Sequence, residues 1–506
     1  MELSGIDIAT FVGFIVFVIA VSLYASRKGE TSEDYFLAGR SLTWWLIGLS
    51  LVASNISTEH FIGMGGKGFE LGLAIASFEW IAAIALVFVA LVLLPRFLRA
   101  GIYTLPEYLE YRYNATARAI MAFYLMVMYV VAAMAGVLYT GGLALHSIFG
   151  VNLYYGVWGI GMLAGVYTVY GGLKAVVWSD LVQGITLMLG GAVVLVLGLR
   201  EVGGLGVFLE VNRNKLHMVL PADHPTMPWT IFLLGIWVPN ICYWGLNQFI
   251  TQRALAAKSL REGQIGILFA AALKLVIPFL VVFPGIIAYQ LYGSEVPQAD
   301  QAYPFLMKRL LPAGLRGVMF AALFGAIMSS LDSMLNSAST ILTIDLYKRH
   351  WARVEPSPRQ LVTMGRWSTA AFVILACLLA PELRRMGPIY DYMQMAWNFI
   401  WPGILAVFML GMFLKRVPAG AAVMGLLVSV PLYAVFIWVV DGPYLNAAAL
   451  AFLTTSAAML LYTLLRPGEP REIPDSGEVD LQASPNAKLF GAVIVVLTVA
   501  LYLYFW

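Results

Sequence analysis

The chain has 506 residues, of which 61% are apolar and 12% are charged, and its formal net charge is +3. The charged share is about half of the roughly 25% that is typical of soluble domains. An ordinary soluble domain is therefore excluded, and the charge gives no sign of a nucleic-acid partner. Both cysteines, Cys242 and Cys377, lie in apolar segments, which excludes a disulfide framework.

Apolar stretches long enough to cross a bilayer follow one another from end to end of the chain. About 20 apolar residues suffice for a helix to cross the roughly 30 Å hydrocarbon core. We predict an all-α integral membrane protein with about fourteen transmembrane helices. The expected spans are 6–26, 44–65, 72–95, 118–146, 152–170, 174–199, 229–251, 264–291, 314–346, 362–381, 388–414, 417–440, 444–465 and 487–505.

The connections between the spans indicate the orientation. The first span has no basic leader before it, so we expect it to be retained. Most Lys and Arg residues fall in connections that are cytoplasmic if the N-terminus is outside, which favours both termini outside. A chain without large loops suggests a plasma membrane, and we expect a bacterial inner membrane. The proline-containing stretch 466–486 is expected to be a flexible linker.

The second span contains an unusual interruption, LVASNISTEHFIGMGG at 51–66, with six polar side chains and three glycines. This composition predicts a helix that unwinds inside the membrane, which is tolerated only where the backbone is buried in protein or lines a wet cavity. The freed carbonyls are suited to a hard cation such as Na⁺. The alternative is a close helix–helix contact made by small residues. That alternative explains the glycines but not Asn55 and His60.

Ionisable side chains occur inside several expected spans, where each costs about 2.5–3.5 kcal/mol to insert and needs a reason. They are Glu79, Asp180, Lys274 and Asp332. A purely structural Glu79–Lys274 ion pair, or an Asp180 that snorkels from its helix end, remain open as alternatives to a functional role.

Two stretches mix amides with aromatic rings. The first, WVPNICYWGLNQFITQR at 237–253, contains Asn240, Tyr243, Trp244, Asn247 and Gln248; the second, IYDYMQMAWNFIWPG at 389–403, contains Tyr390, Gln394, Trp397 and Asn398. A sugar needs aromatic faces for its C–H side and amides for its hydroxyls. For the first stretch, an aromatic belt at the membrane interface, with a helix end near Gln252 and Arg253, is the alternative.

A cluster of hydroxyls lies in AIMSSLDSMLNSAST at 326–340. Ser329 and Ser333 are four residues apart and share a helix face, with Asp332 beside them. Such a set offers oxygen ligands and no soft ones, which suits Na⁺. The alternative is back-bonding of Ser and Thr hydroxyls to helical carbonyls.

Several motifs together resemble the sodium/solute symporter family, and most closely its sodium–glucose or galactose cotransporter branch. The motifs are EDYFLAGRSLTWW, SNISTEHFIGMGGKG, VYTVYGGLKAVVWSDLVQ, YWGLNQFITQRALAAKS and SSLDSMLNSASTILTIDLYK. The resemblance implies a LeuT-like fold with a five-plus-five inverted repeat and discontinuous helices. It divides this single-domain chain into an extra helix and loop (6–43), two repeats (44–199 and 229–414) and peripheral helices (417–506).

The resemblance also implies roles for individual positions. The sodium ligands would be the carbonyls of Ala53, Ile56 and Ala326 and the hydroxyls of Ser329 and Ser330. The sugar ligands would be Asn55, His60, Glu79, Asn240, Lys274 and Gln394. Tyr243, with Trp244 beside it, would close the inner side of the sugar pocket. The hydrophobic group on its outer side would be Met64, Phe78 and Tyr390.

Some positions depart from the family's pattern. His60 and Phe78 stand where the studied bacterial galactose carrier has Gln and Tyr, so the preferred hexose stays open. Asp332 stands where that carrier has a small apolar residue. We hypothesise that Asp332, Ser333 and Asp180 form a second sodium site or line the path by which sodium leaves.

The expected function is sodium-coupled import of glucose or galactose by alternating access, with Na⁺ as the required ion. The alternative is sodium symport of another small polar solute, such as myo-inositol or sialic acid. We expect a bilayer-embedded monomer or weak homodimer. An enzyme is not expected, because the five histidines are scattered and no metal-ligand or Walker A spacing occurs.

Overall fold

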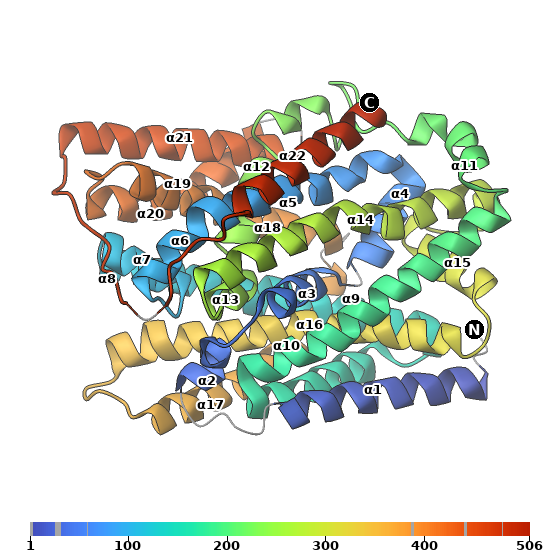
Figure 1. Ribbon diagram of the computed structural model, residues 1–506, viewed down its shortest axis with the longest axis horizontal. Helices are drawn as coiled ribbons and strands as arrows, with labels where there is room; N and C mark the ends of the chain where they lie inside the picture. Colours follow the sequence, from blue (N-terminus) through green and yellow to red (C-terminus); the bar gives the residue numbers. More distant parts are fainter. Residues whose placement is uncertain (1–3, 26–31, 58, 386–388, 440–442, 478) are drawn as a thin grey trace.

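A computed structural model gives the structure of the chain and describes residues 4–25, 32–57, 59–385, 389–439, 443–477 and 479–506. These residues fold as helices, and their β pairings are isolated bridges such as Leu42 with Ala257. Most helices run roughly along the long axis of the molecule (Figure 1). Both chain ends lie toward the same end of this bundle, on the right of Figure 1.

Eleven helical runs in the described residues are long and apolar enough to cross a membrane. They comprise α1 (Gly5–Ala25), α5 (Ser77–Phe88) with α6 (Leu94–Ala100), α8 (Ala115–Val127) with α9 (Ala135–Phe149), the second part of α10 (Leu153–Glu201), α14 (Leu260–Tyr292), α16 (Leu315–Thr340), α17 (Pro358–Leu379), α18 (Ile389–Asn398) with α19 (Trp401–Phe413), α20 (Ala419–Val439), α21 (Tyr444–Leu465) and α22 (Ala487–Tyr504).

The other expected spans coincide with shorter or interrupted helices. These are α3 (Trp44–Asn55) with α4 (Gly65–Leu71), the first part of α10, and α12 (Trp237–Gly245) with α13 (Gln248–Leu255). Short helices outside the expected spans are α2 (Ser32–Leu37), α7 (Leu105–Arg112), α11 (Leu205–Val211) and α15 (Ala302–Leu310).

The predicted interruption of the second span is confirmed. Helix α3 ends at Asn55, and Ile56 has the extended angles φ −72° and ψ 103°. A π-helical turn, η2 (Glu59–Met64), then leads into α4. The glycines also allow a close contact between helices, which was the alternative interpretation. A Cβ on Gly66 would lie 2.8 Å from the carbonyl oxygen of Ala299. The stretch therefore combines an unwound backbone with a close helix contact.

A second interruption separates α12 from α13, where Leu246 and Asn247 leave the helical conformation. This break was not predicted. Gly245 precedes it and Asn247 follows, which are residue types that end and begin helices. Asn247 is fully buried, and its Oδ1 accepts a 2.5 Å hydrogen bond from the hydroxyl of Tyr129. The break therefore lies inside the protein, as irregular backbone at membrane depth requires.

Helix α10 changes direction at Gly172, which has φ 54° and ψ −154°. A Cβ at this position would lie 2.4 Å from the carbonyl oxygen of Tyr35. Only glycine combines this backbone conformation with so close an approach. The bend marks the boundary between the expected spans 152–170 and 174–199.

Replacing Gly172 by alanine is therefore expected to destabilise the fold by at least about 2 kcal/mol, since strained backbone costs of order 1–3 kcal/mol and the clash adds to it. Thermal unfolding in detergent measures the loss. Gly159→Ala is the matched control in the same helix, because no atom lies within 4 Å of its added Cβ. That control should be neutral or stabilising, and equal unfolding temperatures for the two variants would contradict the prediction.

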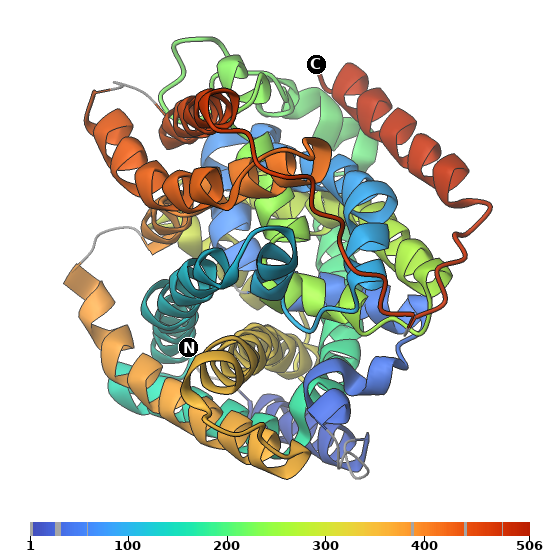
Figure 2. The same ribbon diagram turned by 90° about the vertical axis from the view of Figure 1, so that its left-hand side faces the viewer.

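Helix α16 forms the centre of the bundle. In the apolar part of the run Leu315–Trp351, which contains α16, 94% of the residues are buried, against 22% in α1 and in α22. In the end-on view, α22 lies along the outer edge (Figure 2). Outer helices expose large apolar side chains such as Leu464 and Leu489, as expected for surfaces that face lipid. The polar stretch 326–340 is thus in the most protected part of the molecule.

Residues 466–477 and 479–486 form a strap that main-chain hydrogen bonds hold in place, so the expectation of a flexible linker at 466–486 is wrong. It crosses the helix ends opposite the chain termini (Figures 1 and 2). The amides of Gly468 and Ser476 donate to the carbonyls of Arg416 and Arg99, each at 2.9 Å, and the amide of Leu260 donates to Asp480 at 2.8 Å. These backbone hydrogen bonds hold an extended segment in place, although its composition alone predicts a flexible linker.

Candidate functional site

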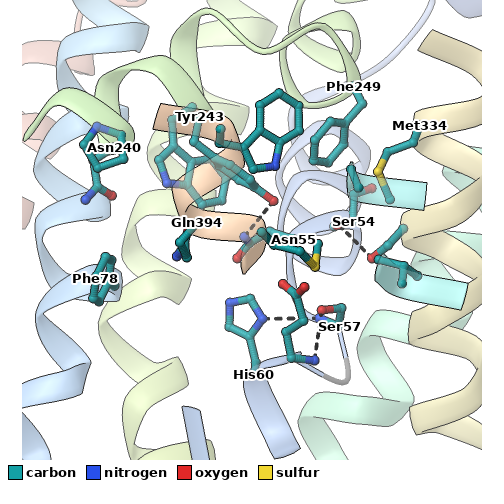
Figure 3. A pocket seen from close by; sticks show the side chains of 18 of the residues that line it. Ser54, Asn55, Ser57, His60, Phe78, Asn240, Tyr243, Phe249, Met334 and Gln394 are labelled. Carbon is teal, nitrogen blue, oxygen red and sulfur yellow. Dashed lines mark hydrogen bonds between the residues drawn. The ribbon is translucent and has the colours of Figure 1, made fainter. Parts of the chain in front are cut away.

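A cavity of about 130 Å³ lies beside the break that follows α3 (Figure 3). Its walls come from the broken stretch and from α5, η5 (Met128–Met134), α9, α12, α13, α16, α18 and α19. Nine of the predicted solute-site and gate residues line it: Asn55, His60, Met64, Phe78, Glu79, Asn240, Tyr243, Trp244 and Gln394. Residues from positions as distant as 54 and 401 thus meet in one chamber.

Lys274 is not part of the cavity lining, but it forms hydrogen bonds with two polar residues that are. Its Nζ donates to Asn55 Oδ1 and, at 2.5 Å, to Glu79 Oε2, and the side chain is fully buried. Glu79 Oε1 lies 3.3 Å from Nε2 of His60, and Asn55 Nδ2 donates to the hydroxyl of Tyr243 at 3.0 Å. The Glu79–Lys274 ion pair, which was the structural alternative, is present, and both of its members also hydrogen-bond the amide or imidazole groups that face the cavity.

Aromatic rings form the opposite part of the lining. Trp397 and Trp401 stack with ring centroids 5.2 Å apart, and Tyr243 packs edge-on against Phe249 at 5.6 Å. The Lys274 ammonium lies 4.7 Å from the ring centroid of Trp244. Trp401 and Phe249 were not among the predicted site residues, although the spacing of four between Trp397 and Trp401 could have suggested a shared helix face.

Two predicted contributors need separate mention. Asn240 donates its amide N–H to the carbonyl of Ile236 at 2.9 Å, so part of its hydrogen-bonding capacity is used within its own helix. Tyr390 belongs to α18, but its side chain lies outside the described part of the structure, and its role as an outer gate stays a prediction.

The end of α3 meets α16 in a second polar junction. The hydroxyl of Ser329 donates to the carbonyl of Ala53 at 3.4 Å, and that of Ser330 donates to the carbonyl of Ser54 at 3.2 Å. The other predicted sodium ligands, Ile56 and Ala326, are buried at 2% exposure. The predicted ligands at this junction are carbonyl and hydroxyl oxygens, a set that fits a hard cation.

The rest of the hydroxyl cluster in α16 follows the alternative interpretation. Ser333 donates to the carbonyl of Ser329 at 2.7 Å, and Ser337 donates to that of Ser333 at 2.8 Å. Such back-bonding is common for hydroxyls in helices. Ser333 also lies 3.3 Å from the hydroxyl of Ser54, so the cluster makes bonds both within α16 and across to α3.

Asp180 is the acceptor at the centre of the junction. Its Oδ2 accepts hydrogen bonds from Ser50 at 2.6 Å, Ser54 at 2.8 Å and Arg253 at 2.7 Å, and its Oδ1 accepts one from Ser329 at 2.5 Å. The Asp180 and Arg253 side chains are both 0% exposed. A snorkelling Asp180 is therefore excluded.

Arg253 is a central residue of this junction that the sequence interpretation missed. It lies in α13, where a helix end at the membrane interface was the expected alternative, yet it is fully buried and also donates to Ser333 at 2.6 Å. The available signal was an arginine directly after an apolar span. If such an arginine is buried, it needs a charged partner within the protein. That partner lies 73 residues away in sequence.

Asp332 occupies a different environment from Asp180. Its Oδ1 accepts a 2.9 Å hydrogen bond from Thr168 in the first part of α10, whereas Asp180 and Ser333 meet at Arg253. The second sodium site formed by Asp180, Asp332 and Ser333 stays a prediction.

A helical membrane bundle with a broken helix, a buried polar cavity and an oxygen-lined junction beside it is the arrangement of a secondary transporter. Residues 35–429 match the sequence model of the Sodium:solute symporter family, and the chain belongs to that family. It is therefore a multi-pass, sodium-coupled solute symporter and not an enzyme, and sodium is a transported co-substrate.

The chain is similar to named proteins along most of its length. It is 41% identical to a sodium/glucose cotransporter of Vibrio parahaemolyticus, covering 100% of this chain and 99% of that protein. It is 33% identical to sodium/myo-inositol cotransporter 2 of Mus musculus, covering 84% and 68%. It superposes with a TM-score of 0.85 on a sodium-coupled sialic acid symporter at 24% identity, covering 93% and 100%. This likeness supports the predicted LeuT-like fold.

Proposed function

We propose that the protein imports a hexose, glucose or galactose, together with Na⁺ by alternating access. The observation that carries this proposal is the cavity itself. Its aromatic residues, Tyr243, Trp397 and Trp401, suit the C–H face of a sugar, and the group organised by Lys274 and Glu79 suits ring hydroxyls. The sodium/glucose cotransporter named above supports the same solute class.

The proposed topology has fourteen crossings, with both termini outside a bacterial inner membrane. The proposed repeats are 44–199 and 229–414, flanked by 6–43 and 417–506. Each repeat then begins with an interrupted helix pair, α3 with α4 and α12 with α13. The position of both chain ends toward one end of the bundle supports an even number of crossings (Figure 1).

Sodium binds, in this proposal, between the end of α3 and α16, with Ala53, Ile56, Ala326, Ser329 and Ser330 as ligands. Asn55 is the last residue of α3 and lies between the proposed ligands Ala53 and Ile56 in the sequence. Its side chain contacts both Lys274 and Tyr243. Ordering of the α3 end by Na⁺ therefore orders the sugar site. The coupling is reciprocal, so sugar must also raise the affinity for sodium.

The membrane potential adds to the driving force. One charge moving across 100 mV is worth about 2.3 kcal/mol, or about 50-fold in sugar concentration.

Inward release of the sugar then requires a movement of Tyr243. In the proposed arrangement Tyr243 lies across the inner side of the pocket, and it must move away from Asn55. Asn55 thus links the ion and the sugar.

Another polar solute is the second candidate. The myo-inositol cotransporter at 33% identity supports a cyclic polyol as the alternative, since it offers the same hydroxyls and C–H faces. Sialic acid is less compatible, because the lining includes the carboxyl groups of Glu59 and Glu79, which would face its carboxylate.

Uptake by purified protein in liposomes tests the proposal. Radiolabelled glucose, galactose, myo-inositol and sialic acid are offered under an inward Na⁺ gradient or a matched K⁺ gradient. We expect saturable, sodium-dependent uptake of glucose or galactose, with each hexose competing against the other. Sodium-driven uptake of inositol without either hexose would establish the alternative, and hexose uptake that ignores sodium would contradict symport.

A further inference from the structure

An open groove of about 460 Å³ lies at the start of α17, apart from the solute cavity and the sodium junction. One wall is η9 (Ile341–Trp351), which continues α16, and the other is α17. An apolar cluster joins the two walls: Ile344 of η9 packs with Leu361 of α17, and Tyr347 of η9 packs against this cluster. The groove therefore lies between two helices that are packed together.

Part of its polar lining is used within α17. Oε1 of Gln360 accepts a hydrogen bond from the backbone amide of Ser357 at 2.8 Å, in the capping box that begins the helix. The hydroxyl of Thr363 donates to the carbonyl of Arg359 at 2.8 Å. These bonds occupy the amide oxygen of Gln360 and the hydroxyl proton of Thr363, so a ligand must bind mainly through other groups of the lining.

The groups that remain are hydrogen-bond donors. They are the guanidinium of Arg359, the indole N–H of Trp367 and the hydroxyl of Tyr347, and none of them is hydrogen-bonded to another residue that the structure describes. Guanidinium and indole groups offer donors and no acceptor, and the guanidinium fork matches the oxygens of a phosphate. The lining therefore favours an anion, and a phosphate in particular.

The surrounding sequence carries an excess of positive charge. Residues 348–366 contain five Lys or Arg and one acidic residue. That residue, Glu355, lies 3.8 Å from Lys348 in a largely exposed pair. Arg359 has no acidic partner within the described part of the chain. The charge at the groove is thus left for a ligand from outside the protein.

The face of α17 that bears the groove continues as a surface that faces lipid. Arg359, Thr363 and Trp367 follow one another at intervals of four residues, and Ile374 and Leu378 continue the same face. Trp367, Ile374 and Leu378 are exposed, and α17 lies at the outer edge of the bundle (Figures 1 and 2). A cation, an interfacial tryptophan and then apolar side chains follow the order of headgroup, interface and hydrocarbon in a bilayer. A lipid can use all three, whereas free phosphate can use only the cation.

The start of α17 lies at the end of the bundle opposite the chain termini (Figure 1). In the proposed topology this end is cytoplasmic. Anionic lipids give the cytoplasmic leaflet a negative surface potential, and basic pockets between helices on that side bind their headgroups.

We propose that the groove between η9 and α17 binds one anionic phospholipid, with its phosphate at Arg359 and its acyl chains along Ile374 and Leu378. The lipid contacts both the end of the central helix α16 and the peripheral helix α17, so its binding stabilises the folded protein. The site does not depend on the proposed solute, and only its place in the inner leaflet rests on the proposed topology.

The test measures the melting temperature of the full-length protein, purified and delipidated in dodecyl maltoside. Dioleoylphosphatidylglycerol, which is anionic, or dioleoylphosphatidylcholine, which is zwitterionic, is added at increasing mole fraction in the micelle. We expect phosphatidylglycerol to raise the melting temperature of wild type and phosphatidylcholine to raise it less. Arg359→Gln should need about fivefold more phosphatidylglycerol for half of the effect, which is the contribution of one basic residue at an anionic surface.

Arg353→Gln is the matched control. Arg353 belongs to the same basic stretch, is exposed and has no acidic partner among the described residues, but it does not line the groove. General attraction between a basic surface and anionic micelles would weaken both variants equally. A site in the groove predicts that this control stays within about twofold of wild type.

Three results would overturn the proposal. One is equal weakening of the lipid effect by Arg353→Gln and Arg359→Gln. Another is stabilisation by phosphatidylcholine as strong as that by phosphatidylglycerol. The third is stabilisation of the lipid-free protein by inorganic phosphate that Arg359→Gln abolishes, because the groove would then bind a soluble anion. Wild-type uptake under a sodium gradient tests the proposed function separately, so neither failure implies the other.

Discussion

Replacing Lys274 with methionine is expected to abolish sodium-driven hexose uptake. The substitution leaves Glu79, which is 4% exposed, without its cation and Asn55 without its donor. Removing one partner of a buried ion pair costs about 3–5 kcal/mol. We therefore expect uptake to fall at least about 100-fold, measured as the initial rate in liposomes per amount of folded protein.

A double variant separates folding from sugar binding. Lys274→Met with Glu79→Gln removes both charges, so it should recover folded protein while uptake stays lost. Lys67→Met is the control, because Lys67 forms a partly exposed pair with Glu70, and exposed pairs contribute little. Wild-type uptake by the Lys274 variant would show that this lysine has no part in solute binding.

A second large effect is expected at Arg253. Its guanidinium neutralises Asp180 at the sodium junction, with both side chains fully buried. Arg253→Met should leave an uncompensated carboxylate beside the proposed sodium ligands. We expect the variant to depend on sodium for its stability. Its half-saturating sodium concentration should be at least about tenfold lower than in wild type. Its turnover should be slower, because the release of sodium is impeded.

Melting temperature against sodium concentration and uptake rate measure these two effects. Arg309→Met is the control, since Arg309 pairs with Glu295 where both side chains are about half exposed. If Arg253→Met needs as much sodium as wild type, the Asp180–Arg253 pair does not set the affinity of the junction.

The local chemistry of the second span could be interpreted from sequence. Polar residues and glycines in an apolar stretch predict unwinding, and Ile56 is indeed extended. The ion pair between Glu79 and Lys274 was also within reach, since charges in a membrane seek each other. The positions of most cavity residues followed from the resemblance to a family, because a cavity is a property of the folded chain.

Other features depended on contacts between distant parts of the chain. The serines of α16 have the same chemistry, yet Ser330 reaches across to α3 while Ser337 bonds within its own helix. Which hydroxyl faces which neighbour depends on the rotation of the helix, and sequence spacing does not determine it. The break at Leu246 and the partnership of Arg253 with Asp180 were missed for the same reason.

The strap formed by residues 466–477 and 479–486 joins three helix ends that lie far apart in the sequence. It ties the connection after α19 through Arg416, the end of α6 through Arg99 and the start of α14 through Leu260. A rocking motion that pulled these three helix ends apart would have to break main-chain hydrogen bonds at the water-facing surface. We therefore expect the helix ends joined by this tether to move together in a transport cycle, with the hinge elsewhere.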